Sequence, residues 1–207
     1  MISIFLKKII NKMTNHFVNL VSWRYFYQNK SSNRKIHIDS FSLYLCCRLF
    51  GKFLKKKSGI NFFHNNLNIE KSIFLLGDEN KLFENKIILP FWESIDDVCI
   101  DNLIIKEVEG YESIVIGICS PKQDRLADLI NEIYPKKNIF CLGAAIYTAP
   151  NSLRGDRLSL NWLVMMLNDF KRFKEKIKIT IIEVFSIIFI SKSRKSFKQF
   201  LKKNTFI

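Results

Sequence analysis

Short apolar runs alternate with stretches of helical periodicity along most of the chain. Buried strands are expected at residues 16–22, 35–38, 72–77, 98–105, 114–119 and 138–142. Helices are expected at residues 1–13, 41–55, 80–88 and 159–173, and a further helix begins at 23–28. This alternation predicts an α/β fold with a mostly parallel, Rossmann-like sheet that carries helices on both faces.

The clearest junction between a strand and a helix reads IVIGICSPKQD at residues 114–124. Ser120 is the expected N-cap, Pro121 suits the first helical position, and Gln123 completes a capping box. The helix that follows carries apolar residues on one face: Leu126, Leu129, Ile130 and Ile133. Free N–H groups and the positive end of a helix dipole meet at such a start, so it can accept a phosphate.

Several residues stand where the predicted strands end, which is where parallel sheets bind ligands. They are Asn19, Asp39, Gly77, Ser120 and Gly143. Asp39 is the first acidic residue of the chain, and the next is Glu70. Its cationic surroundings favour an ionised carboxylate that acts as a general base. The alternative is that Asp39 only caps the helix at 41–55.

Charge divides the chain into three parts. The net charge is +14, but residues 1–57 hold twelve basic and one acidic residue, residues 58–170 hold ten and sixteen, and residues 171–207 hold eleven and two. The composition is 48% hydrophobic, enough for a packed core. We therefore expect an amphipathic helix at 1–15, one α/β domain at 16–173 and a basic C-terminal appendage at 174–207.

The basic appendage predicts contact with an anionic membrane surface. Its apolar run at 179–190 contains Glu183 and is shorter than the roughly 20 residues that a spanning helix needs. Residues 192–203 are basic again, with interleaved apolar residues: Phe197, Phe200 and Leu201. A segment lying on the membrane surface fits this pattern. The alternatives are a helix packed on the core with a solvated tail, and a nucleic-acid partner.

Neither a metal nor a cofactor is expected. The five cysteines have no Cys-x-x-Cys spacing, and the three histidines are scattered. Dinucleotide-binding and P-loop motifs are missing. The start of the chain lacks a secretory cleavage pattern, so a reduced, cytoplasmic protein is expected.

The residue identities at 120–145 are a more specific signal than the pattern of strands and a helix alone. Ser-Pro-Lys-Gln-Asp at 120–124 follows an apolar strand, and a second apolar strand ends in Cys-Leu-Gly-Ala-Ala at 141–145. This resembles the glycosyltransferase family of WecG, TagA and CpsF. Members of that family usually carry Gly-Ser-Pro-Lys-Gln-Glu, followed by a strand that ends in a small, glycine-rich turn. The likeness covers roughly residues 16–173 at low overall identity.

The resemblance extends to earlier segments. The family has an Asp-Gly pair at the end of an early strand, upstream of an apolar helix, and that aspartate is its proposed catalytic base. IHIDSFSLYLCCRLFGK looks like this segment and places Asp39 at the position of the base. Asn19 matches an asparagine at the end of the preceding strand. Lys56 stands where the family has an arginine before a Thr-Gly loop.

The resemblance also implies a binding site for a sugar nucleotide. Gln123 would lie beside the nucleotide sugar, together with Lys122. The helix start at Ser120 or the turn at Gly143 would face the diphosphate. Arg172 matches a late arginine of the family.

Some positions depart from the family pattern. Asp124 replaces a glutamate, Ser40 replaces a glycine, and Asn161 and Met165 replace a glutamate and an arginine. The family's Arg-Ala-Pro element is reduced to Thr-Ala-Pro at 148–150. The loss of cations weakens stabilisation of a departing diphosphate. Three residues are candidate replacements: Arg154, Arg157 and Lys171.

The resemblance implies two functions. The first is an inverting, metal-independent glycosyltransferase of bacterial surface polysaccharide synthesis. It would move an N-acetylhexosamine-type or related sugar from a UDP-sugar to a polyprenyl-diphosphate-linked acceptor at the inner face of the cell membrane. The second is a catalytically degenerate member that binds the membrane and assists a partner glycosyltransferase. A homo-oligomer is a further candidate assembly, and nucleic acid is not an expected partner.

Overall fold

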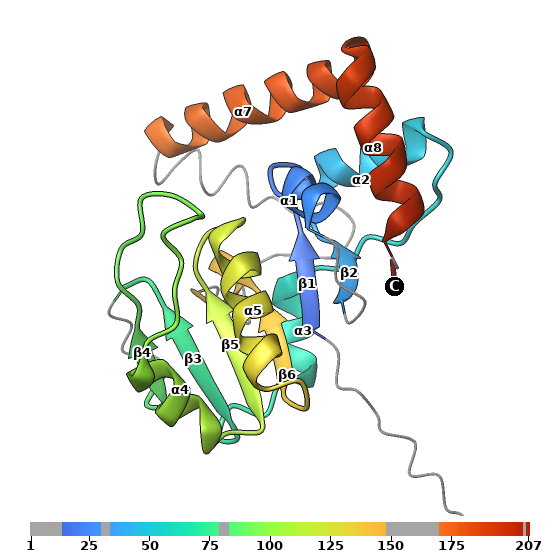
Figure 1. The fold of residues 1–207 in the computed structure, drawn as a ribbon. Coiled ribbons are helices and arrows are strands. Elements are labelled where there is room, and N and C mark those ends of the chain that lie inside the picture. Colours follow the sequence, from blue (N-terminus) through green and yellow to red (C-terminus); the bar gives the residue numbers. More distant parts are fainter. Residues whose placement is uncertain (1–13, 30–33, 79–82, 148–169, 205) are drawn as a thin grey trace, which may run out of the picture.

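The computed structural model describes residues 14–29, 34–78, 83–147, 170–204 and 206–207, except for the side chains of Ala144, Tyr147, Arg172, Phe173 and Lys176. Within these residues, six parallel strands form one sheet in the order β2-β1-β6-β5-β3-β4 (Figure 1). The strands are β1 (Thr14–Val18), β2 (Arg34–Ile38), β3 (Ser72–Leu76), β4 (Lys86–Ile88), β5 (Ser113–Gly117) and β6 (Asn138–Cys141). The predicted parallel α/β fold is confirmed.

Helices cover both faces of this sheet. They are α1 (Trp23–Gln28), α2 (Phe41–Leu49), α3 (Gly59–Asn66), α4 (Asn102–Glu109), α5 (Lys122–Ile133), the 3-10 helix η1 (Gly143–Tyr147), α7 (Phe170–Phe189) and α8 (Ser191–Lys203). Alternate residues of each strand point to opposite faces. Ile73 and Leu75 of β3 therefore pack with α4 and α5, whereas Phe74 and Leu76 pack with α3 and η1.

The C-terminal helix α8 is part of the core. Phe197, Phe200 and Leu201 are buried in a cluster with α1, α2 and the ends of β1 and β2. The ring of Phe197 meets that of Trp23 edge to face, with centroids 5.2 Å apart. These three apolar residues of the segment expected at the membrane are thus internal, because a neighbouring helix offers them an apolar surface.

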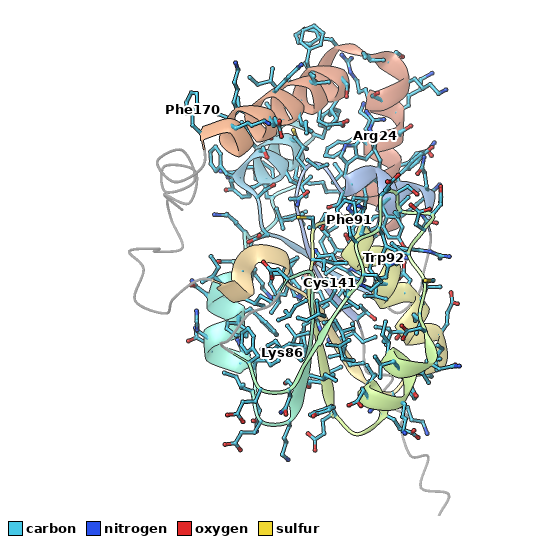
Figure 2. The ribbon with its side chains drawn as sticks, turned by 90° about the vertical axis from the view of Figure 1, so that its left-hand side faces the viewer. Arg24, Lys86, Phe91, Trp92, Cys141 and Phe170 are labelled. Carbon is cyan, nitrogen blue, oxygen red and sulfur yellow. The ribbon has the colours of Figure 1, made fainter. Side chains whose placement is uncertain are left out.

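Helix α7 lies beyond the carboxyl ends of the strands in both views (Figures 1 and 2). Glu183, the acidic residue that interrupts its apolar run, accepts hydrogen bonds from Arg24 Nε at 3.1 Å and Trp23 Nε1 at 3.1 Å. This half-buried carboxylate therefore ties α7 to α1. Among the described residues, we find no helix with both the length and the apolar character that spanning a bilayer requires.

Two predicted elements are wrong. The strand expected at 98–105 is largely the helix α4, whose N-cap Asp101 accepts a hydrogen bond from Ile104 N at 2.8 Å. Ile104 and Val108 are buried four residues apart, so the β-branched residues that suggested a strand form a helical face. The helix expected at 80–88 ends as the strand β4, because Lys86–Ile88 pairs with β3.

Other predicted elements differ at their ends. The helix expected at 41–55 stops at Leu49, and Gly51 follows with a φ of 74°, a conformation that favours glycine. Gly59, three residues after Lys56, is the first residue of α3. Residues 1–13 and 159–169, where helices were expected, lie outside the described residues, and Thr14 already belongs to β1.

Matched phenylalanine truncations test how α8 and α7 pack. We expect Phe197→Ala to lower the free energy of unfolding by about 3–5 kcal/mol, since it empties a buried site. Phe189→Ala, at a side chain that is 63% exposed, should change it by less than about 0.5 kcal/mol. Urea unfolding of the full chain measures both. Equal small effects would show that α8 does not dock on the domain.

Candidate functional site

The candidate site lies where four neighbouring strands end. In the order β2, β1, β6 and β5, the chain continues into Asp39, Asn19, Gly143 and Ser120. The segment after β1 leads to α1, whose Tyr25 hydroxyl donates to Asp128 of α5, and the segment after β6 leads to η1, which packs with α3. Parallel sheets bind ligands at such a switch point. Asn19 and Gly143 flank it directly.

Asp39 is anchored by backbone groups at this edge. Its Oδ1 accepts a hydrogen bond from Gly59 N at 3.1 Å, and its own N–H donates to Val18 O at 3.1 Å. Gly59 in turn packs against Ala145 of η1, where an added Cβ would lie 3.5 Å from the Ala145 Cβ. The carboxylate therefore sits beside the turn that begins at Gly143.

Asp39 does not cap α2. The N-cap is Ser40, whose hydroxyl oxygen accepts a hydrogen bond from Leu43 N at 3.2 Å. The capping alternative for Asp39 is therefore wrong, and its carboxylate is held by the first residue of α3 instead. Ser40, which departs from the family's glycine, has a capping role that glycine fills less well.

Burial raises the pKa of the Asp39 carboxyl above its ordinary value. The hydrogen bond from Gly59 N and the charge of Lys56 act in the opposite direction but are smaller. The expectation that cationic neighbours dominate is therefore wrong, since desolvation of the charged form outweighs them. A carboxylate with a raised pKa is a stronger base, which suits proton abstraction.

Asn19 and Lys56 are half-buried beside this carboxylate. The side-chain oxygen of Asn19 accepts hydrogen bonds from Val21 N at 3.0 Å and Ser22 N at 3.2 Å, which shapes the turn after β1. Lys56 forms an isolated parallel bridge with Ile38 at the end of β2. Asn19 therefore has a local structural role in addition to any contact with a ligand.

The start of α5 differs from the predicted capping box. The helix begins at Lys122 with Pro121 as its N-cap, and no side chain caps it. The Gln123 amide instead donates to the Ser120 hydroxyl oxygen at 2.6 Å. Lys122 donates from Nζ to the carbonyl oxygen of Trp92. Its ammonium group therefore points to the loop after β4 rather than to the strand ends.

Gln123 and Gly143 lie against each other. Gln123 is 2% exposed, and its Oε1 has no hydrogen-bond donor within the described part of the chain. Gly143 has a φ of 55°, and a Cβ added there would lie 3.5 Å from that Oε1. The positive φ favours glycine at this position, whereas the 3.5 Å spacing is an ordinary van der Waals contact. Arg172 belongs to α7, and its side chain is outside the described part, as are Arg154 and Arg157.

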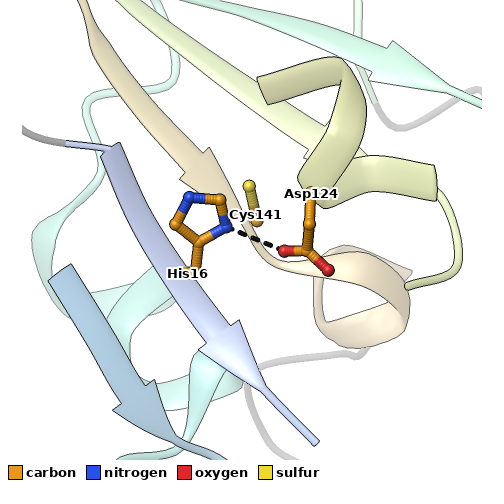
Figure 3. A group of neighbouring side chains, drawn as sticks. All are labelled: His16, Asp124 and Cys141. Carbon is orange, nitrogen blue, oxygen red and sulfur yellow. Dashed lines mark hydrogen bonds and ion pairs between the residues drawn. The ribbon is translucent and has the colours of Figure 1, made fainter. Parts of the chain in front are cut away.

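A second polar cluster lies inside the domain, below the strand ends. His16 Nδ1 lies 2.8 Å from Asp124 Oδ1, Cys141 is adjacent, and all three side chains are buried (Figure 3). The sequence predicts a buried strand at 138–142, which contains Cys141, but it does not predict this cluster. The available signal was a histidine at a core-facing position of β1, which a hydrophobic strand does not need.

The same layer continues to a buried ion pair. Arg34 of β2 contacts Asp128 of α5, which also accepts a hydrogen bond from the Tyr25 hydroxyl. Burial and the Asp128 charge raise the pKa of Tyr25. Asp124 and Asp128 are four residues apart and share one helical face. That face packs against β1 and β2, so both carboxylates lie inside the protein.

No protein-family model matches this chain, and neither a curated protein nor a solved structure is similar to it. The assignment of the site therefore depends on its own geometry. That geometry combines the fixed Asp39 carboxylate, whose pKa is raised, with the Gly143 turn at the switch point. The buried Gln123 Oε1, which has no donor within the described residues, lies against that turn. Such a set can bind a polar ligand with a hydroxyl group and remove a proton from it.

The pKa of Asp39 can be compared with that of Asp97 in the same molecule. Asp97 is exposed, and its hydrogen bonds with Ser94 lower its pKa. A carbon-detected NMR titration should therefore give Asp39 a midpoint above 3.8 and Asp97 one below it. Assignment uses Asp39→Asn and Asp97→Asn. An Asp39 midpoint at or below that of Asp97 contradicts the buried setting.

The free energy of unfolding should depend on pH because the pKa of Asp39 is raised in the folded state. The folded state binds the Asp39 proton more tightly than the unfolded chain does, so this group stabilises the fold at low pH and loses that contribution as pH rises through its folded pKa. The stability of Asp39→Asn relative to the parent should therefore increase as pH rises from about 3 to 7. Urea unfolding across this range measures the difference, and a constant or falling difference contradicts the prediction.

Proposed function

We propose that the chain is a glycosyltransferase that uses Asp39 to deprotonate the hydroxyl of a sugar acceptor, with a UDP-sugar as donor. The acceptor would be a polyprenyl-diphosphate-linked saccharide, and the reaction would belong to bacterial surface polysaccharide synthesis. The observation that carries the proposal is the placement of Asp39 beside the Gly143 turn, through Gly59. The resemblance to the WecG, TagA and CpsF family supplies the substrate class.

The distances allow a donor and an acceptor to bind together. Neighbouring strands are about 4.8 Å apart, and β2 and β6 are separated by β1 alone, so the ends of these two strands lie about 10 Å apart along the edge. That span accommodates a sugar between the base and a diphosphate at the turn.

Stabilisation of the leaving diphosphate depends on fewer cations than the family pattern provides. Lys122 is engaged by the Trp92 carbonyl and lies over the ring of Phe91, 5.2 Å from its centroid. Lys56 lies near enough to Asp39 for its charge to act on the pKa of that carboxyl. Backbone N–H groups of the Gly143 turn are further donors that can face a diphosphate.

An apolar surface supports action at a membrane. Along α7 and its last turn, eight large apolar side chains are exposed by 42% or more: Phe170, Ile177, Ile179, Ile181, Ile182, Phe185, Phe189 and Ile190. Helix α2 and its C-terminal extension, which contact α7, expose Phe41, Leu45, Leu49 and Phe53. Exposed lysines follow the same helices, including Lys52, Lys171, Lys174 and Lys178. Apolar and basic groups together suit an anionic lipid surface.

Sugar transfer provides the direct test. Purified full-length protein, a panel of labelled UDP-sugars and a short prenyl-diphosphate-linked N-acetylglucosamine acceptor should yield a transferred product. Asp39→Asn should lower the turnover number by about 10²–10⁴-fold, because it removes the general base. The matched control Asp97→Asn, at an exposed turn, should keep the parent activity.

Two outcomes decide against parts of this proposal. Transfer by Asp39→Asn at the parent rate would remove the base assignment. A lack of transfer with every donor, together with retained vesicle binding, would favour the alternative role of a degenerate member that assists a partner glycosyltransferase. The engaged Lys122 and the changes at Asn161 and Met165 motivate that alternative.

Vesicle binding tests the apolar surface. Ile181→Glu combined with Phe185→Glu should weaken binding to phosphatidylglycerol-containing vesicles by about tenfold or more. The double variant loses two apolar side chains and gains two negative charges that the anionic lipid repels. Leu103→Glu, at a 58% exposed position of α4, should bind like the parent. Co-sedimentation measures all three proteins. Unchanged binding by the double variant would exclude this surface. Truncation of α8 is unsuitable, because it removes core residues.

A further inference from the structure

We infer that His16, Asp124 and Cys141 form a structural binding site for a divalent transition metal, with zinc as the best match. Their candidate ligand atoms, Nδ1, a carboxylate oxygen and Sγ, all lie within 4.8 Å of one another. Figure 3 shows the three side chains converging between β1, β6 and the first turn of α5. This site is separate from Asp39, and the inference is independent of the proposed transfer activity.

The fold brings these three residues together through sheet register. His16 of β1 and Cys141 of β6 are direct partners across two parallel strands, so their side chains emerge on the same face of the sheet. That face is covered by α5, and Asp124 is in its first turn. Three segments far apart in sequence therefore supply one ligand each from regular secondary structure, which is a rigid way to build a metal site.

The ligand chemistry favours zinc. Imidazole nitrogen, thiolate sulfur and carboxylate oxygen are the three donor types that zinc uses in proteins. A neutral imidazole, one carboxylate and one thiolate carry two negative charges, which a divalent ion neutralises. The adjacent Arg34 and Asp128 balance each other as an ion pair and leave this charge uncompensated. Soft sulfur in the set disfavours magnesium and calcium.

Hydrogen bonding alone leaves the cluster incompletely satisfied. Within the described part of the chain, Asp124 Oδ2 is buried and has no hydrogen-bond partner. His16 Nε2 is also buried without a partner, but a metal bound at Nδ1 would not contact it. The thiol of Cys141 makes only a long contact of 3.9 Å to the Gln123 carbonyl oxygen. Buried polar atoms without partners are costly, so such a group points to a missing ligand. A bidentate Asp124 carboxylate on the metal would occupy both of its oxygens.

The adjustments that a metal needs are small. Tetrahedral zinc with bonds of about 2.0–2.3 Å places its ligand atoms roughly 3.3–3.7 Å apart. His16 Nδ1 and Asp124 Oδ1, now 2.8 Å apart, would therefore separate by about 0.5 Å. Rotation of the Cys141 side chain moves Sγ inward. The Gln123 carbonyl oxygen, already near Sγ, or a water molecule would complete the coordination.

Metal binding would clamp the start of α5 to β1 and β6. Asp124 is next to Gln123, and Cys141 is two residues before Gly143, so the clamp would fix the two elements of the switch point against each other. A ligand that binds the folded chain and not the unfolded chain raises stability in proportion to the logarithm of its concentration. The site would thus stabilise the domain without taking part in chemistry.

Cobalt substitution tests this inference on the full-length chain. Chelator-treated protein titrated with Co²⁺ should bind about one equivalent. It should develop visible d–d bands of a tetrahedral ion and a near-ultraviolet charge-transfer band from a Co–thiolate bond. Cys141→Ser should lose the charge-transfer band, whereas Cys119→Ser, at an exposed cysteine, should keep it. Zinc should displace the cobalt and raise the unfolding temperature of the parent but not of His16→Asn.

X-ray absorption of the zinc-loaded parent guards against variants that fail to fold. One sulfur and two or three nitrogen or oxygen neighbours are expected. Coordination without sulfur, or a cobalt spectrum that lacks the thiolate band in the parent, would overturn the inference and leave His16–Asp124 as a plain buried hydrogen bond. Loss of the band in Cys119→Ser rather than in Cys141→Ser would assign the metal to the surface and overturn it equally.

Discussion

The polar contacts between α5 and the first two strands fix the geometry of the whole carboxyl-end edge. Asp124 meets His16 of β1, and Asp128 meets Arg34 of β2, in an otherwise apolar layer. Apolar packing is tolerant of small shifts, but a buried charge has to face its partner. These two contacts therefore set the rotation and height of α5, and with them the position of Gln123 against the Gly143 turn. The candidate donor site depends on that placement.

Much of the sheet was predictable, because β3, β5 and β6 are mostly apolar runs and β1 and β2 each hold two apolar residues. The positions of β1, β2, β3, β5 and β6 follow from local hydrophobicity alone. Failures occurred where local sequence is ambiguous. Ile104 and Val108 fit either a strand or one face of a helix, and only the packing of α4 on the sheet decides. The short strand β4 depends on pairing with β3, a non-local contact that no sequence window contains.

The candidate site was also predictable only in part. Asp39, Gln123 and Gly143 were identified from the sequence, and their common edge follows from parallel strands. Two contacts could not be predicted from local sequence. Gly59 N donates to Asp39, about 20 residues away, and Lys122 Nζ donates to the Trp92 carbonyl oxygen, about 30 residues away. Asp124 and Asp128 resemble a solvated helix face in sequence. Only the strand register and the path of α5 show that this face is internal.

Asp39 and the exposed apolar surface are connected through α2. That helix begins two residues after Asp39, and Leu45 and Leu49 on its outer side remain exposed while Leu43 and Cys46 enter the core. Contact of α2 and α7 with a lipid surface would therefore orient the strand ends relative to the bilayer, because α7 lies beyond those ends (Figure 1). A lipid-linked acceptor carries its diphosphate at the membrane surface and its sugar in water. An edge held at that boundary would meet such a sugar without extracting the lipid, and under the proposed function this would account for the apolar side chains exposed along α2 and α7.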